Sequence, residues 1–179
     1  TMSKVVGLWL FPALTAVLVV VFAVIPRIDP LRENIAAFRT YYDWFVVIFA
    51  AYMFVLHAGI LAFNLGYEFD FLSLVLVAAA GLLYYAGILV SHAERNWFVG
   101  IRTPWTLSSE VVWRRTHDLG GTLFKLTGLL TLVGLFVGEY ALYFLVVPAL
   151  LTAVVTVVYS YILYERLERS GGPSSDPGA

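Results

Sequence analysis

Residues 5–25, VVGLWLFPALTAVLVVVFAVI, are 21 consecutive residues without a charged side chain. An α-helix of about 20 apolar residues crosses a hydrocarbon core about 30 Å thick. The run exceeds the apolar core of a secretory signal peptide, which has about 7–15 residues, and it ends in Pro26 and Arg27 rather than in a small-residue cleavage site. We therefore expect residues 5–25 to remain in the protein as a membrane span.

Four further apolar runs follow, at 44–64, 71–91, 121–137 and 140–164. Lys125 interrupts the run 121–137 near one end, where its long side chain can reach the lipid headgroups. The chain of 179 residues is 61% hydrophobic and 13% charged, whereas a soluble domain is about 45–50% apolar and about 25% charged. The sequence therefore predicts an all-α, polytopic helical bundle with five transmembrane spans.

These spans form one predicted membrane domain, residues 1–169, in which residues 92–120 are a long connection between the third and fourth spans. The tail 170–179, SGGPSSDPGA, is polar and rich in glycine and proline. Such a composition buries too little apolar surface to order a chain, so we expect the tail to be disordered.

Basic residues lie almost entirely on one side of the predicted bundle. Ten of the eleven lysine and arginine residues fall in the connections 26–43 and 92–120, at the start of the fourth span or directly after the fifth span, at Arg166 and Arg169, and only Lys4 lies on the other side. Cytoplasmic loops of membrane proteins are enriched in lysine and arginine. We therefore expect a multi-pass protein of the cell membrane, with the N-terminus outside and the C-terminus in the cytoplasm.

The connection 26–43 carries the signals of a helix. Asp29 followed by Pro30 is typical of an N-cap with proline in the first helical position. Apolar side chains then recur at helical spacing, at Leu31, Ile35, Phe38, Tyr42 and Phe45. The pattern predicts an amphipathic, interfacial cytoplasmic helix that runs into the second span.

Small and polar residues recur at helical spacing inside four of the spans, and in membranes such residues mark the faces where helices touch. They are Asp43, Ala50, His57 and Asn64; Ser73, Ala80, Tyr84, Gly87 and Ser91; Thr127, Thr131, Gly134 and Gly138; and Thr152, Thr156 and Ser160. Packing within the bundle is the plainer interpretation, and a lined cavity or a homo-oligomer contact through Gly134 and Gly138 is the alternative.

His57 is the one ionisable residue deep inside a predicted span. We predict that it is neutral and hydrogen-bonded to Thr131, or to a backbone carbonyl freed by Pro12 or Pro148. A proton or metal site is the functional alternative. No second histidine or carboxylate lies at that depth to complete a metal shell, and the chain has no cysteine. We expect neither a metal nor a cofactor.

The stretch RNWFVGIRTPWTLSSEVVWRRTHDLGG, residues 95–121, is rich in charged, aromatic and hydroxyl side chains. It holds four arginines, three tryptophans, a histidine and five hydroxyl side chains within 27 residues, and a plain linker between two spans is usually shorter. One interpretation is an interfacial elbow whose arginines contact lipid phosphates. The alternative is a folded cytoplasmic cap that binds a partner or holds the spans in one state.

Local signals within this stretch predict a turn and a short helix. Gly100 permits a turn, and Thr103 before Pro104 favours an extended step. We expect Thr106 or Ser108 to cap a short helix. After it, three residues are expected to face the bilayer and two to break or bend the chain; they are Val112, Thr116 and Leu119, and Gly120 and Gly121.

The same stretch resembles the signature of the SdpI family, the immunity proteins of the sporulation-delaying-protein toxin system. The resemblance is carried by Asn96, Gly100, Ile101, Arg102, Thr103, Pro104, Trp105, Thr106, Ser109, Trp113, Thr116, His117, Gly120 and Gly121. It continues more loosely from PRIDPLRENI, residues 26–35, through the fourth span. These signature residues are the candidate site, with either a partner-binding or a structural role.

The resemblance implies a multi-pass, non-enzymatic protein that protects a cell from a secreted, membrane-active peptide toxin. For the founding system it also implies a receptor role, in which the toxin-bound protein holds a small autorepressor at the membrane. The predicted outward links, 65–70 and 138–139, are too short to form a toxin-binding domain. A toxin would therefore be recognised by span faces in the outer leaflet, near His57, and the stretch 95–121 would signal to the repressor. With a net charge of −1, the chain itself offers nothing to nucleic acid.

Two other functions remain open on the sequence. A small transporter or channel would need ionisable residues along a path across the core, and the chain offers His57 with Lys125 and Asp43 at the rims. An interfacial lipid-acting enzyme would need a nucleophile and a base, and the nominal parts are Ser108, Ser109, His117 and Asp118. The Gly-x-Ser-x-Gly elbow of many serine hydrolases is absent from the sequence.

Overall fold

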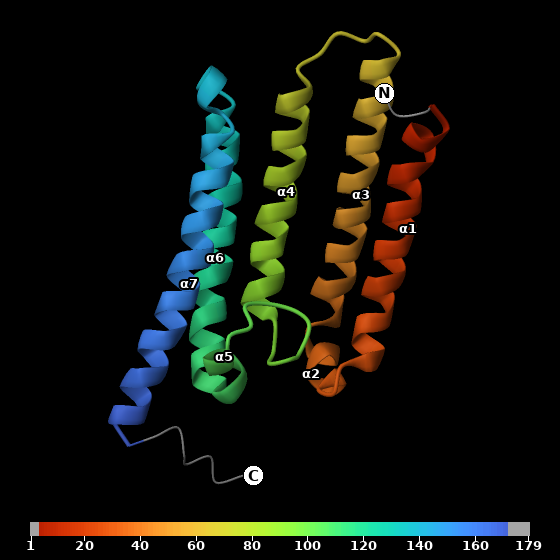
Figure 1. The fold of residues 1–179 in the computed structure, drawn as a ribbon. Helices are drawn as coiled ribbons and strands as arrows, with labels where there is room; N and C mark the ends of the chain where they lie inside the picture. Colours follow the sequence, from red (N-terminus) through yellow and green to blue (C-terminus); the bar gives the residue numbers. More distant parts are fainter. Residues whose placement is uncertain (1–3, 172–179) are drawn as a thin grey trace.

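A computed structural model describes residues 4–171, and this part of the chain is folded entirely as helices and their connections (Figure 1). The elements in chain order are α1 (Lys4–Ile28), α2 (Arg32–Ala37), α3 (Arg39–Asn64), α4 (Phe71–His92), α5 (Pro104–Ser108), α6 (Glu110–Gly134), the 3₁₀ helix η1 (Gly138–Tyr140) and α7 (Tyr143–Arg169). The predicted all-α class is confirmed. Of the predicted disordered tail, residues 172–179 lie outside the described residues.

Four segments within residues 4–171 are long and apolar enough to cross a membrane. They are Val6–Ile28, Arg39–Asn64, Phe71–His92 and Gly138–Arg169. The helix α6 has 25 residues, as many as α1. Its first half carries Glu110, Arg114, Arg115 and Asp118, so it is less apolar than the other four.

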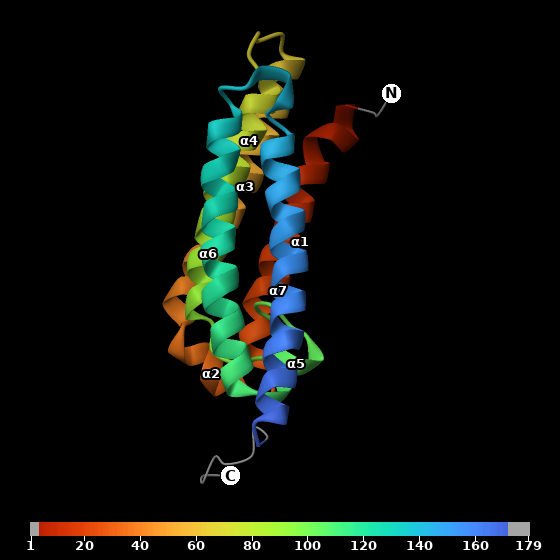
Figure 2. The same ribbon diagram turned by 90° about the vertical axis from the view of Figure 1, so that its left-hand side faces the viewer.

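Three helices form a layer, and two more lie on one side of it. α4 packs between α3 and α6, while α1 packs mainly on α3 and α7 mainly on α6. Figures 1 and 2 together show α1 and α7 on the same side of the α3–α4–α6 layer, at its two edges. The central part of α4 is therefore flanked, rather than covered, by α1 and α7.

The contact between α4 and α6 depends on glycine. A Cβ atom added at Gly121 would lie 2.6 Å from the Gly87 carbonyl oxygen, and one added at Gly128 would lie 2.7 Å from the Ala80 carbonyl oxygen. Real Cβ atoms do not approach other atoms so closely. Small residues thus let the two backbones touch, as membrane helices commonly do.

The contact between α6 and α7 depends on hydroxyls and one glycine. The Oγ1 atoms of Thr127 and Thr152 are 3.2 Å apart, and both side chains are buried. A Cβ atom added at Gly134 would lie 2.5 Å from Cβ of Phe144. Thr127, Gly134 and Thr152 therefore pack within one chain, and α7 covers Gly134, whereas Gly138 is exposed with nothing within 4 Å of its Cβ position.

The prediction that Gly120 and Gly121 break or bend the chain is wrong. α6 continues through both residues, because each glycine makes room for a neighbour. A Cβ atom added at Gly120 would lie 2.2 Å from Cδ1 of Ile101. The prediction that Val112 and Thr116 face the bilayer is also wrong, since both are fully buried inside the protein.

The predicted hydrogen bond of His57 is wrong as well. Its Nδ1 atom is buried without a hydrogen-bond partner, and its ring stacks on Phe11 of α1 at a centroid distance of 6.0 Å. Thr131 instead donates to the Thr127 carbonyl oxygen at 2.8 Å. The physical reason is the order of the layer, in which α4 separates α3, carrying His57, from α6, carrying Thr131.

Candidate functional site

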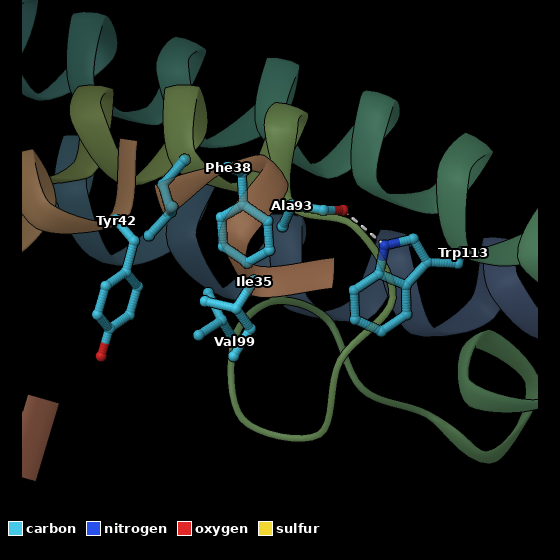
Figure 3. Close-up of a cluster of buried hydrophobic side chains, with 7 residues drawn as sticks. Ile35, Phe38, Tyr42, Ala93, Val99 and Trp113 are labelled. Atoms are coloured by element: carbon cyan, nitrogen blue, oxygen red, sulfur yellow. Dashed lines mark hydrogen bonds between the residues drawn. The ribbon is translucent and has the colours of Figure 1, made fainter. Parts of the chain in front are cut away.

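The connection between α4 and α6, residues 93–109 (hereafter the motif loop), folds against the bundle end that carries α2 and α5. A buried apolar cluster joins the loop to the helices (Figure 3), and its members are Ile35, Phe38, Tyr42, Leu89, Ala93, Val99 and Trp113. Ile35, Phe38 and Tyr42 are 1–2% exposed, but the predicted single helix is interrupted at Phe38, because α2 ends at Ala37 and α3 begins at Arg39. Their apolar face is turned toward the chain's own motif loop.

Asp29 and Asn34 attach the motif loop to the first connection. The carboxylate of Asp29 accepts from the backbone N–H of Trp97 at 2.9 Å and from that of Leu31 at 2.7 Å. Nδ2 of Asn34 donates to the Arg95 carbonyl oxygen at 2.7 Å. The prediction that Asp29 caps the helix is wrong, because α2 begins after Leu31 without a side-chain cap and the carboxylate is committed to the loop.

Asn96 organises the first turn of the motif loop from a fully buried position. Its Nδ2 donates to the carbonyl oxygens of Glu94 and Val99 at 2.8 and 2.9 Å. Its Oδ1 accepts from the backbone N–H groups of Phe98 and Val99 at 2.9 and 2.6 Å. All four hydrogen bonds that an asparagine side chain can make are therefore satisfied.

Gly100 and His117 are in direct contact. Gly100 has φ +107°, and a Cβ atom there would lie 2.3 Å from Nε2 of His117. The backbone N–H of Ile101 donates to that Nε2 at 3.0 Å, while Nδ1 of His117 lies 2.8 Å from the Trp113 carbonyl oxygen. Since Nε2 accepts a hydrogen bond, the proton of the neutral ring is on Nδ1.

Burial keeps this imidazole neutral. Loss of hydration lowers the pKa of His117 to about 4, against the opposing effects of its hydrogen bond to the Trp113 carbonyl and of nearby Asp118. The ring stacks on the Trp113 indole with a centroid distance of 3.9 Å. Trp113 in turn donates from Nε1 to the Ala93 carbonyl oxygen at 2.7 Å, which joins α6 to the end of α4 (Figure 3).

Thr103 and Thr106 connect the motif loop to α7. They form a reciprocal capping box at the start of α5, where Pro104 follows the cap. Oγ1 of Thr103 lies 3.3 Å from Oγ of Ser160 on α7. The prediction that Thr106 or Ser108 is the cap is wrong: Thr103, before the proline, caps α5, and Ser109 caps α6, which holds Glu110 in its first turn.

Most signature residues are therefore brought together, and a few point outward. Those buried in the loop and in the first half of α6 are Asn96, Thr103, Thr106, Ser109, Trp113, Thr116, His117, Gly120 and Gly121. Arg102 is exposed and donates from Nη1 to the Trp97 carbonyl oxygen at 2.7 Å. Trp105 packs edge-on against Tyr161 of α7 at 5.1 Å. His57 and Thr131 lie apart from this cluster and from each other.

Sequence reasoning missed three contacts of the site. Asp29 and Asn34 could have been identified as site residues, because both lie within the stretch PRIDPLRENI, residues 26–35, to which the resemblance extends. Ser160 was assigned only to helix packing. In each case the partner is far away in the sequence, so local spacing carries no information about the pairing.

A cavity of about 350 Å³ opens beside Trp113 and His117. Its polar lining includes Glu94, Glu110, Arg114 and Asp118. Within residues 4–171, no group of three histidine, aspartate or glutamate side chains is placed to hold a metal ion.

Comparison with known proteins agrees with the resemblance found in the sequence. The model of the SdpI/YfhL protein family matches residues 92–160, which include the motif loop, α6 and most of α7. The chain is 31% identical over 120 residues to "Immunity protein SdpI" of Bacillus subtilis (strain 168). The match covers 66% of this chain and 58% of that relative, so the chain spans less than two thirds of the relative's length. No solved structure matches the chain. The resemblance predicted from residues 95–121 is thus confirmed at residues 92–160, which match the SdpI/YfhL family model, and the chain is a multi-pass cell-membrane protein.

Proposed function

We propose that this chain is a membrane immunity protein, which protects the membrane that holds it from a membrane-active peptide toxin. The name of the Bacillus subtilis relative supports the proposal, because the match, with 31% identity, extends over 66% of this chain. The observation that carries it is the motif loop: Asp29, Trp113, His117 and Ser160, from three separate parts of the chain, all hydrogen-bond to this loop. A ligand that displaced one of these parts of the chain would therefore also displace the loop.

We infer five spans, with residues 121–137 as the fourth and the motif loop in the cytoplasm. These 17 residues follow the charged first half of α6, and a transmembrane helix needs about 17–25 predominantly apolar residues. The residues after Gly121 contain a single charge, Lys125. The end of the bundle that carries α2 and α5 also carries most of the arginines, which favours the cytoplasmic side.

We propose further that the toxin is met in the outer leaflet and that a cytoplasmic repressor docks at the motif loop. The links at the other end of the bundle are short, which supports recognition by helix faces. At the loop end, Trp105 is half-buried and Arg102 is exposed, so both offer side-chain area to a partner. The cavity beside Trp113 adds charged groups of both signs.

A protective role suits this site better than catalysis does. Both ring nitrogens of His117 are engaged by backbone groups, so neither is free to act as a general base. Oγ of Ser108 donates to the Pro104 carbonyl oxygen at 2.8 Å, away from that ring. The Thr127–Thr152 pair likewise supports a packed seam rather than a transport path.

A protection assay tests the proposal. The chain is expressed in a bacterial strain that lacks its own immunity protein and is exposed to the sporulation-delaying peptide, and membrane depolarisation and survival are measured. We expect the wild-type chain to protect and His117→Ala to protect less at equal membrane abundance. Absence of protection by wild-type chain that is present in the membrane at a normal level would contradict the proposal.

A further inference from the structure

An apolar cavity of about 260 Å³ lies where the motif loop meets the uncovered side of α4. Its walls come from α1, α3, α4, α6 and the loop, and they include Phe22, Phe45, Leu89, Phe98, Ile101 and Phe124. The lining is far more apolar than that of the cavity beside Trp113. The cavity therefore suits a hydrocarbon ligand.

The size of the cavity limits what it can hold. Drug-sized ligands use pockets of about 300–1,000 Å³, so a cavity of about 260 Å³ lies just below this range. A narrow ligand, such as a segment of one extended acyl chain, suits a cavity of this size.

The rim of the cavity carries a cation, Arg102, that lacks an acidic partner. Arg102 follows the lining residue Ile101, is exposed, and donates from Nη1 to the carbonyl oxygen of Trp97, the residue before Phe98. No carboxylate lies within ion-pair distance of Arg102 among residues 4–171. Most of its N–H donors are therefore free for an anion.

Aromatic side chains at the same rim indicate the depth of a headgroup. Trp97 is 51% exposed and Phe98 is 39% exposed, and aromatic residues of this kind concentrate at the membrane–water interface. The guanidinium of Arg102 lies at the Trp97 backbone, so the cation and the aromatic rim share one level. Basic pockets between spans at that level bind anionic lipid headgroups.

We propose that this cavity is a binding site for one anionic phospholipid. One acyl chain lies in the cavity against α4, between α1 and α7, and the phosphate is held by Arg102. The lipid completes the face of α4 that the protein leaves uncovered, and it connects the motif loop to the composition of the bilayer.

Photocrosslinking tests the proposal. The full chain is placed in phosphatidylcholine nanodiscs that contain a trace of phosphatidylglycerol with a photoreactive acyl chain, and crosslinked peptides are mapped by mass spectrometry. We expect crosslinks on peptides that contain Phe22, Leu89 or Phe98. Arg102→Gln should lower the yield about ten-fold, because a hydrogen bond to a charged group is lost. Ala86→Phe, which fills the cavity, should abolish the crosslinks.

Arg115→Gln is the matched control, because it removes an exposed charge from α6 that does not line the cavity, and its yield should equal that of the wild type. Helical content by circular dichroism verifies that each variant is folded, and Arg102→Gln changes only an exposed side chain. Equal yields from photoreactive phosphatidylcholine, an unchanged yield in Arg102→Gln, or crosslinks spread evenly over all helices would overturn the proposal. A co-purified peptide found in place of lipid at these residues would overturn it as well.

Discussion

Nε2 of His117 accepts a hydrogen bond from the backbone N–H of Ile101 at 3.0 Å, and this bond holds the motif loop at Ile101 against α6. The bond requires a lone pair on Nε2, so it exists only while the imidazole is neutral. Gly100, directly before Ile101, leaves room for the ring. The loop is thus held by an interaction that a proton would destroy.

The stability of the protein should therefore fall as the pH drops below about 6.5. Histidine in an unfolded chain titrates near pH 6.5, and burial lowers the pKa of His117 to about 4. Between these values the unfolded state binds the extra proton, so stability is retained above pH 6.5, declines as the pH falls and levels off below pH 4. The full loss is about 3 kcal/mol. Thermal unfolding in detergent at about pH 7.5 and pH 5 should show about 2 kcal/mol of this loss.

His117→Gln supplies the control for this pH dependence. Glutamine does not titrate, so the variant should lose less stability between the two pH values than the wild type, although both retain His57 and His92. Equal pH dependence in the two proteins would show that His117 is not the responsible group.

Asp29→Ala should release the motif loop from the first connection. The substitution removes two hydrogen bonds to a buried carboxylate and leaves the Trp97 N–H unpaired, at a cost of about 1.5–3 kcal/mol per bond. Hydrogen exchange followed by mass spectrometry should show faster exchange over residues 95–101. Glu33→Ala, at an exposed acidic position on α2, should leave this exchange unchanged, and equal effects of the two variants would count against the tether.

Gly121→Ala should separate α4 from α6. Its Cβ atom would lie 2.0 Å from Oγ of Ser91 and 2.6 Å from the Gly87 carbonyl oxygen, and such overpacking costs about 1–3 kcal/mol. Gly81→Ala is a matched control, because a Cβ atom there meets nothing within 4 Å. It should be neutral or stabilising by up to about 1 kcal/mol. Thermal unfolding of both variants distinguishes a close helix contact from a general intolerance of alanine.

The sequence predicts what depends on local pattern and fails where a partner is distant. Apolar length predicts the helices, and the spacing of Ile35, Phe38 and Tyr42 predicts a buried face. Asp29 looks like a helix cap from its neighbours alone, whereas its partner Trp97 is 68 residues away. Composition does not reveal that pairing.

Glycine and histidine inside the spans show the same limit. Gly120 and Gly121 would weaken a helix in water, but between packed membrane helices they allow close approach. The predicted hydrogen bond between His57 and Thr131 rests only on their depth in the membrane. Depth does not give the lateral order of the helices. That order, with α4 between α3 and α6, follows from which faces pack together.

The proposed docking of a repressor requires the motif loop to face the cytoplasm, and cysteine labelling tests this directly. The chain has no cysteine, so single variants Ser108→Cys at the loop and Gly66→Cys at the opposite link, both exposed, can be treated with a membrane-impermeant maleimide. We predict that Gly66→Cys is labelled in intact cells and that Ser108→Cys is labelled only in inverted vesicles. Labelling of Ser108→Cys in intact cells would place the loop outside and contradict the account.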